Sequence, residues 1–219
     1  MTFWIAIDGP SGAGKSTAAK GVARRLGFRY LDTGAMYRAV AVGCLRSGVD
    51  HGDGPAIADV TRGLDLDIST DPDNQYILLA GDDITRAIRE PAVSAWVSAV
   101  STNPECRAEL VRRQQAIIAG GDFVLEGRDT TTVIAPTAQV RLLLVARPEA
   151  RLRRRGAELG AKVDAAQLRD QVLRRDQDDS TLVDFQNAAA GVRVLDSTDL
   201  TIDAVQDQII AWARQAGLS

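Results

Sequence analysis

The sequence predicts an α/β protein in which a five-stranded parallel sheet is covered by helices on both faces. Five short apolar runs, near residues 3, 28, 123, 140 and 192, alternate with segments of helical composition. This alternation is typical of a parallel sheet, because each crossover helix returns the chain to the same end of the sheet. The first apolar run also passes directly into a glycine-rich turn and then a helix, an order typical of phosphate-binding loops. We therefore expect residues 1–219 to form a single domain around one sheet.

The glycine-rich turn carries the complete pattern Gly9-x-x-x-x-Gly14-Lys15-Ser16. Glycines let successive backbone N–H groups point at one phosphate chain, and the following helix adds the positive end of its dipole. In this pattern the lysine reaches the β- and γ-phosphates, and the serine hydroxyl ligates Mg²⁺. The alternative is a plain turn between a strand and a helix, which would not require the whole pattern. The sequence predicts that a nucleoside triphosphate binds to Gly9, Pro10, Ser11, Gly12, Ala13, Gly14, Lys15, Ser16 and Thr17, with Ser16 as the metal ligand.

The composition argues against several classes of protein. A net charge of −3 and a pI near 5.3 do not suit a protein that binds nucleic acid through its overall charge. The single histidine, His51, and two cysteines without metal-ligand spacing argue against a Ser–His–Asp triad or a zinc site. No apolar run is long enough to span a bilayer, and no secretory signal precedes the first strand. We therefore expect a cytoplasmic protein with no nucleic-acid or membrane partner.

The elements that follow the glycine-rich turn are indicated by composition and by punctuating residues. Residues 16–26 have helical composition and end at Gly27, a favourable residue just after a helix. Residues 28–31 form the second apolar strand. Residues 38–60 have the composition of two helices, separated by the polar turn at 50–54.

A different pattern then indicates a small antiparallel sheet. Residues 64–69 alternate apolar with polar, as a half-exposed strand does. A turn at 71–74 leads to a second short strand at 76–79, and a further turn at 81–85 introduces a third short strand or a helix cap. We assign residues 36–100 to an insertion that contains this sheet and binds the acceptor substrate.

Helix caps and apolar runs predict the helices and strands in the second half of the chain. Asn103 and Pro104 have the preferences of a helix start, so a helix over residues 91–102 is followed by another over 104–119. Thr201 likewise caps a C-terminal helix. The remaining strands of the main sheet are expected at residues 123–125, 140–145 and 192–195.

Arginine provides 23 of the 26 basic residues and is concentrated in one segment. From Arg147 to Arg175, nine basic residues accompany four acidic ones. Guanidinium groups make planar, bidentate contacts to phosphate, so we predict that residues 148–185 form a lid over the triphosphate. A solvated pair of helices linked by ion pairs is the alternative, and codon bias could account for much of the arginine.

Several motifs of this chain occur together in one known family. They are Asp8–Ser16, Leu31–Arg38, Ile88–Arg89, the helical pair around Ser98 and Arg107, Glu126–Asp129, and Arg175-Asp176-x-x-Asp179-Ser180. In this combination the chain resembles the bacterial cytidylate kinases over nearly its whole length. The small sheet is similar to the insertion that distinguishes this family from other nucleoside-monophosphate kinases.

The resemblance implies a P-loop kinase that uses ATP and Mg²⁺ to phosphorylate CMP or dCMP, a small-molecule substrate, and it leads us to expect a monomer. The implied clamp on the acceptor phosphate consists of Thr33, Arg38 and Arg128. The implied readers of cytosine are Ser98, Arg107 and Asp129. Arg175 and Asp179 are similar to family residues that span the sugar and the transferring phosphoryl group. The resemblance thus assigns catalysis to Lys15, Arg128, Arg175 and Asp179.

Two positions depart from the family pattern. Thr131 stands where the family usually has glycine, and Leu182 stands where it usually has a further phosphate-binding arginine. Leucine cannot bind phosphate, so turnover and the geometry of the lid depend on whether a neighbouring arginine compensates.

Other interpretations stay open at this point. Arg38 could be a solvated helix residue, and Asp129 could be the N-cap of the segment after it. A kinase for a hydroxyl acceptor would need a carboxylate base, for which Asp32 is the candidate. A nucleotide-dependent switch without an acceptor is the third possibility, although a GTPase would need an Asn-Lys-x-Asp run and no Asn-Lys pair occurs.

Overall fold

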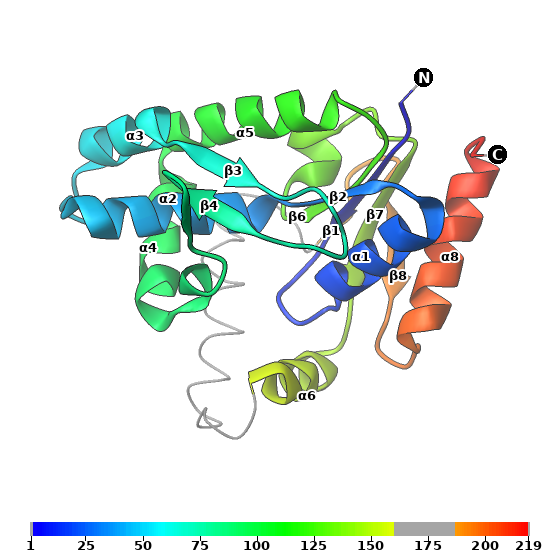
Figure 1. Cartoon of the computed structure of the whole chain (residues 1–219). Coiled ribbons are helices and arrows are strands. Elements are labelled where there is room, and N and C mark those ends of the chain that lie inside the picture. Colours follow the sequence, from blue (N-terminus) through cyan, green and yellow to red (C-terminus); the bar gives the residue numbers. More distant parts are fainter. Residues whose placement is uncertain (1, 160–186, 219) are drawn as a thin grey trace.

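The protein is built around a five-stranded parallel sheet with the strand order β2-β6-β1-β7-β8 (Figure 1). The computed structural model describes residues 2–159 and 187–218. The strands are β1 (Trp4–Asp8), β2 (Arg29–Asp32), β6 (Phe123–Gly127), β7 (Val140–Val145) and β8 (Arg193–Asp196). The predicted five-stranded parallel sheet is therefore confirmed, and each strand lies within two residues of its predicted position.

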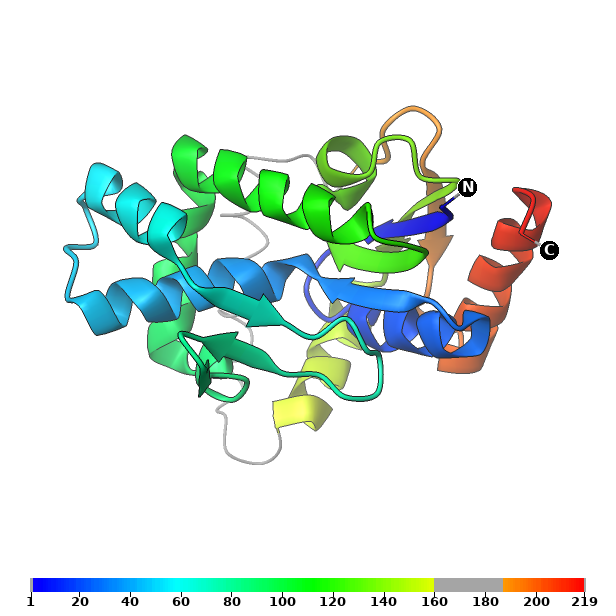
Figure 2. The same ribbon diagram turned by 45° about the horizontal axis from the view of Figure 1, so that its top comes forward.

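Helices cover both faces of the sheet, as Figures 1 and 2 show. On one face, α1 (Lys15–Leu26) and α8 (Ile202–Gln215) pack on Ile5 and Ile7 of β1. On the other face, Ala6 faces a second core formed with α2 (Thr33–Ser47), α4 (Pro91–Thr102) and α5 (Pro104–Ile118). Alternate residues of β1 thus enter different cores, as the two-residue period of a strand requires. A strand buried on both faces reads as a continuous apolar run, which is why the sequence signal was strong.

The inserted segment contains the small antiparallel sheet that the alternating pattern predicted. Its strands are β3 (Leu66–Ile68), β4 (Ile77–Leu79) and β5 (Asp82–Asp83), in that order. The helix α3 (Gly54–Gly63) precedes it, and the 3₁₀ turn η1 (Ala87–Arg89) connects it to α4. Figure 2 shows this sheet lying beside α2, where Ile77 and Leu79 contribute to the core.

Two further described segments follow β6 and β7. A π-helical turn, η2 (Thr130–Ile134), follows β6 where the sequence analysis proposed no helix, and α6 (Pro148–Leu159) follows β7. The prediction of a lid at 148–185 falls on α6 and then on residues outside the described part of the chain. Arg175, Asp179 and Leu182 also lie outside it.

Asn103 supports a junction between two helices that the sequence predicted from its cap residues. Its Oδ1 accepts hydrogen bonds from the backbone N–H groups of Glu105 and Cys106, at 3.0 and 3.3 Å. Its Nδ2 donates to the carbonyl oxygen of Gly54 at 2.8 Å, which ties the start of α5 to the start of α3. One side chain therefore satisfies both a helix cap and a contact between helices.

We predict that Asn103→Ala lowers the free energy of unfolding by about 1–2 kcal/mol, because the cap is lost. Asn103→Ser keeps an oxygen that accepts from the first helical turn and loses the amide donor to Gly54 without placing a second acceptor against that carbonyl oxygen, so it should be less destabilising than Asn103→Ala. Chemical denaturation of both variants measures the two contributions. Equal stability of Asn103→Ala and the unmodified protein would contradict the role of the cap.

Candidate active site

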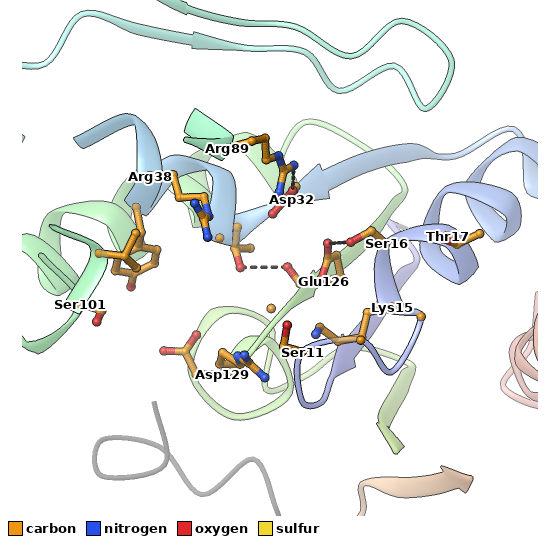
Figure 3. A pocket seen from close by; sticks show the side chains of 18 of the residues that line it. Ser11, Lys15, Ser16, Thr17, Asp32, Arg38, Arg89, Ser101, Glu126 and Asp129 are labelled. Atoms are coloured by element: carbon orange, nitrogen blue, oxygen red, sulfur yellow. Dashed lines mark hydrogen bonds and ion pairs between the residues drawn. The ribbon is translucent and has the colours of Figure 1, made fainter. Parts of the chain in front are cut away.

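The carboxyl ends of β1, β2 and β6 meet at a cleft of about 180 Å³ (Figure 3). Ligands bind at this edge of open parallel sheets, as the sequence analysis assumed. The predicted site residues that line the cleft are Ser11, Gly12, Gly14, Lys15, Ser16, Thr17, Thr33, Arg38, Arg107, Arg128 and Asp129. Gly9, Pro10, Ala13 and Ser98 do not line it.

Three glycines of the phosphate-binding loop, Gly9, Gly12 and Gly14, have positive φ angles. Gly9 has φ 148°, and a Cβ atom placed there would lie 2.1 Å from the carbonyl oxygen of Leu144 on β7. Gly14, at φ 92°, is the N-cap residue of α1. The loop therefore turns directly from β1 into the start of α1, where backbone N–H groups and the helix dipole favour an anion. Lys15 Nζ donates to the carbonyl oxygen of Pro10 at 3.1 Å.

A buried carboxylate, Glu126, lies beside the loop and was not assigned a role from the sequence. Ser16 Oγ donates to Glu126 Oε1 at 2.5 Å (Figure 3). Tyr30 Oη donates to the same oxygen at 3.2 Å. Burial raises the pKa of Glu126, and the nearby Asp32 raises it further, whereas Lys15 and the two hydroxyl donors lower it. The available signal was a charged residue at the end of an otherwise apolar strand, close to a phosphate-binding loop.

The three residues of the implied acceptor-phosphate clamp lie around the same cleft. Thr33 Oγ1 donates to the carbonyl oxygen of Glu126 at 2.8 Å. Arg38 is buried rather than solvated and donates to the carbonyl oxygen of Ile88 at 2.7 Å. Arg128 Nη1 donates to the carbonyl oxygen of Gly9 at 2.6 Å. A buried guanidinium in a polar cleft is suited to an anionic ligand, which favours the clamp over the interpretation of Arg38 as a surface residue.

Arg107 and Asp129 form a partly buried ion pair, and both residues line the cleft. Burial raises the pKa of Asp129, and the Arg107 guanidinium opposes this effect. Asp129 makes no capping hydrogen bond to η2, so the alternative role as an N-cap receives no support. Ser98 is half-buried outside the lining, and Ser101, one turn further along α4, lines the cleft instead (Figure 3).

Asp32, the candidate base for a hydroxyl acceptor, is already used in the structure. One carboxylate oxygen accepts from the backbone N–H of Ala35 at 2.9 Å and caps α2. The other lies 3.1 Å from an Nη atom of Arg89 in an ion pair. Both carboxylate oxygens are engaged by other groups of the protein, so this geometry disfavours the hydroxyl-acceptor alternative.

The arginines of α6 reach the back of the loop. Arg151 Nη1 donates to the carbonyl oxygen of Ser11 at 3.1 Å. Arg154 Nη1 lies 3.4 Å from the carbonyl oxygen of Ala13 and also donates to Ser197 Oγ at 3.0 Å. The described part of the arginine-rich segment therefore contacts the triphosphate-binding loop, as a basic element over this site would.

Among residues 2–159 and 187–218, no helix is both long and apolar enough to cross a membrane. The same part of the chain contains no cluster of three or more His, Cys, Asp or Glu side chains arranged to hold a metal ion.

We predict that Glu126→Gln stabilises the protein increasingly as the pH rises above the ordinary carboxyl pKa. A buried acid with a raised pKa keeps its proton longer in the folded state, so it lowers stability as the pH rises through the raised pKa. The amide is neutral and can still accept from Ser16 and Tyr30. Urea denaturation at pH 5, 6, 7 and 8 should show the stability of Glu126→Gln relative to the unmodified protein growing with pH. The exposed Asp67→Asn is the control for removing one negative charge, and a flat or reversed trend for Glu126→Gln would contradict the assignment.

Comparisons with known proteins agree with this geometry. The family model for cytidylate kinase matches residues 5–215. A cytidylate kinase of Cutibacterium acnes is 50% identical over 208 residues, which cover 94% of this chain and 93% of that protein. A cytidylate kinase of Pelotomaculum thermopropionicum is 42% identical over 212 residues and 94% of each chain. The crystal structure of an uncharacterized protein from Eubacterium ventriosum shares the fold, with a TM-score of 0.53 at 12% identity, over 98% of this chain and 99% of that one. This chain belongs to the cytidylate kinase family.

Proposed function

We propose that this chain is a cytidylate kinase that transfers the γ-phosphoryl group of ATP to CMP or dCMP, giving ADP and CDP or dCDP. The observation that carries the proposal is one cleft lined both by the phosphate-binding loop and by the buried Arg107–Asp129 pair. The loop supplies the donor site. The ion pair supplies hydrogen-bonding groups for a base, and the cations of the clamp line the same cleft.

The acceptor needs no general base in this reaction. A phosphate monoester has a second pKa near 6, so it is largely deprotonated at pH 7 and already nucleophilic. Phosphoryl transfer passes through a loose transition state, for which positioning and neutralisation of charge provide most of the catalysis. Lys15, Arg38 and Arg128 provide fixed cations for this purpose. Arg175 and Asp179 stay predicted contributors.

Ser16 and Glu126 fit an Mg²⁺ ion that accompanies ATP. Ser16 donates its hydroxyl proton to Glu126, so the lone pairs of Oγ are left for a cation. Mg²⁺ prefers hard oxygen ligands and is commonly held by one or two protein groups, waters and substrate phosphates. Bound there, the ion would neutralise charge on the β- and γ-phosphates.

Asp129 is suited to distinguish cytosine from uracil. A carboxylate accepts a hydrogen bond from the N4 amino group of cytosine, but it would face the O4 carbonyl of uracil with acceptor against acceptor. A site that is built on such hydrogen bonds discriminates strongly, because the wrong base leaves buried polar groups unpaired. Arg107 holds Asp129 through an ion pair and offers further donors. Ser98 stays a predicted third contact.

The division of the chain follows from this assignment. We assign residues 36–100 to the acceptor-binding insertion and residues 148–185 to a lid within one kinase domain. The contacts of Arg151 and Arg154 with the loop support the role of the first part of the lid. We further propose that the kinase acts as a monomer.

A coupled assay of ADP release with a panel of monophosphates tests the function. We expect kcat/KM for CMP and dCMP to exceed kcat/KM for UMP, AMP and GMP. The variant Asp129→Asn should reduce the CMP/UMP ratio of kcat/KM about tenfold or more, because one discriminating hydrogen bond is worth about 1–3 kcal/mol. Equal rates for CMP and UMP in the unmodified protein would refute the assignment. ADP release without any acceptor would favour the switch instead.

We predict that Ser16→Ala, which removes the hydroxyl, raises the Mg²⁺ concentration needed for half-maximal activity by about 10–100-fold. This is a typical loss when a group that supports a metal is removed. The measurement is the Mg²⁺ concentration that gives half-maximal activity at saturating ATP and CMP. Ser16→Thr retains the hydroxyl and should behave like the unmodified protein, since phosphate-binding loops accept either residue. An unchanged Mg²⁺ requirement in Ser16→Ala would exclude Ser16 as the ligand.

A further inference from the structure

A buried carboxylate, Asp8, accepts four hydrogen bonds from two consecutive threonines. Asp8 lies at the end of β1 and is 3% exposed. Its Oδ1 accepts from the backbone N–H and the hydroxyl of Thr130, at 2.8 and 2.7 Å. Its Oδ2 accepts from the same two groups of Thr131, at 2.9 and 2.6 Å. Two oxygens thus hold two residues of a neighbouring loop through both their main chain and their side chains.

The held residues come directly after the pair that faces the acceptor nucleotide. Arg128 and Asp129 lie between the end of β6 and the threonines, so Asp8 fixes the chain on their C-terminal side. The carbonyl oxygen of Asp129 also accepts from the N–H of Val133 at 2.9 Å, which continues the constraint into η2. Arg128 is held a second time, because it donates to the carbonyl oxygen of Gly9, the residue after Asp8.

Thr131 donates to Asp8 through its hydroxyl, a group that the glycine usual in the family at this position lacks. Ala80 is the only non-glycine residue of the described chain with a positive φ, so the backbone at position 131 does not require glycine. The position tolerates a Cβ atom, and threonine uses it to place a buried hydroxyl on Asp8. A hydrogen bond to a charged group is stronger than one between neutral groups, and buried bonds of this kind keep a loop in one arrangement.

We propose that Asp8 is a positioning residue which, through the Thr131 hydroxyl, sets the geometry of Arg128 and Asp129 for the acceptor nucleotide. The inference rests on the proposed function, because it assigns that pair to the acceptor. Asp8 itself does not line the substrate cleft, and it acts from behind the loop. The Thr131 hydroxyl therefore contributes to selectivity for the acceptor without touching it.

Thr131→Val and Thr131→Ala remove the hydroxyl, and Thr131→Ser retains it. Thr132→Val is the matched control, because Thr132 is the exposed neighbour in the same turn. We expect Thr131→Val and Thr131→Ala to raise the KM for CMP about tenfold and to lower the CMP/UMP ratio of kcat/KM, while the KM for ATP stays within about twofold. Thr131→Ser and Thr132→Val should retain the unmodified constants. The backbone amide signals of Arg128 and Asp129 in NMR spectra should move in the Val and Ala variants only.

Three results would overturn the proposal. The first is an unchanged KM for CMP together with unmoved amide signals in both hydroxyl-deleted variants. The second is an equal rise in the KM values for ATP and CMP in those variants. The third is a Thr131→Ser variant as impaired as Thr131→Val. The amide signals report the position of the loop whatever substrate is turned over. If the unmodified protein failed to phosphorylate CMP, the proposed function would fall, and selectivity for the acceptor with it. A failure of the variants alone would remove only the positioning role.

Discussion

The parallel register of β1 and β6 sets Asp8 opposite Gly127, and most of the site follows from that pairing. Both strands end at the same edge of the sheet, so the phosphate-binding loop and the loop that begins at Arg128 leave it side by side. Gly127 permits a further close approach, because a Cβ atom there would lie 2.3 Å from Thr33 Oγ1 at the start of α2. Three chain segments from distant parts of the sequence thereby converge within hydrogen-bond distance of one another.

This convergence buries several charged side chains, which would be costly without partners. Asp8 has four donors, and Asp129 has the guanidinium of Arg107. Arg38 donates to a carbonyl oxygen, and Glu126 accepts from two hydroxyls. Fully satisfied polar networks are rigid, and rigidity suits a site whose catalysis depends on fixed charges. The raised pKa of Glu126 shows that the compensation is incomplete there, beside the proposed metal site.

The sequence predicted the strands and the long helices of the described chain, but not the contacts between them. The doubly buried strands and the capped helices have strong local signals, so α4 was predicted to the residue, and the phosphate-binding loop has a pattern that few other sites share. The turn η2 was not predicted, because its conformation depends on Asp8, more than 120 residues away in the chain. The position of Glu126 at the end of an apolar strand was a signal in the sequence, but its hydrogen bonds were not predicted, since its partners come from two other elements.

The local positive charge of the cleft explains how a chain with a net charge of −3 handles polyanions. Lys15, Arg128 and Arg151 each donate to a backbone carbonyl oxygen within residues 9–11. A carbonyl oxygen has no net charge, and a phosphate oxygen is a stronger acceptor for the same donors, because charge-assisted hydrogen bonds are about twice as strong. A phosphate group bound in the loop would offer Lys15 and Arg128, which line the cleft, this stronger acceptor. The cations proposed to neutralise the transition state are thus gathered around the loop by the fold, while the chain as a whole keeps a negative net charge.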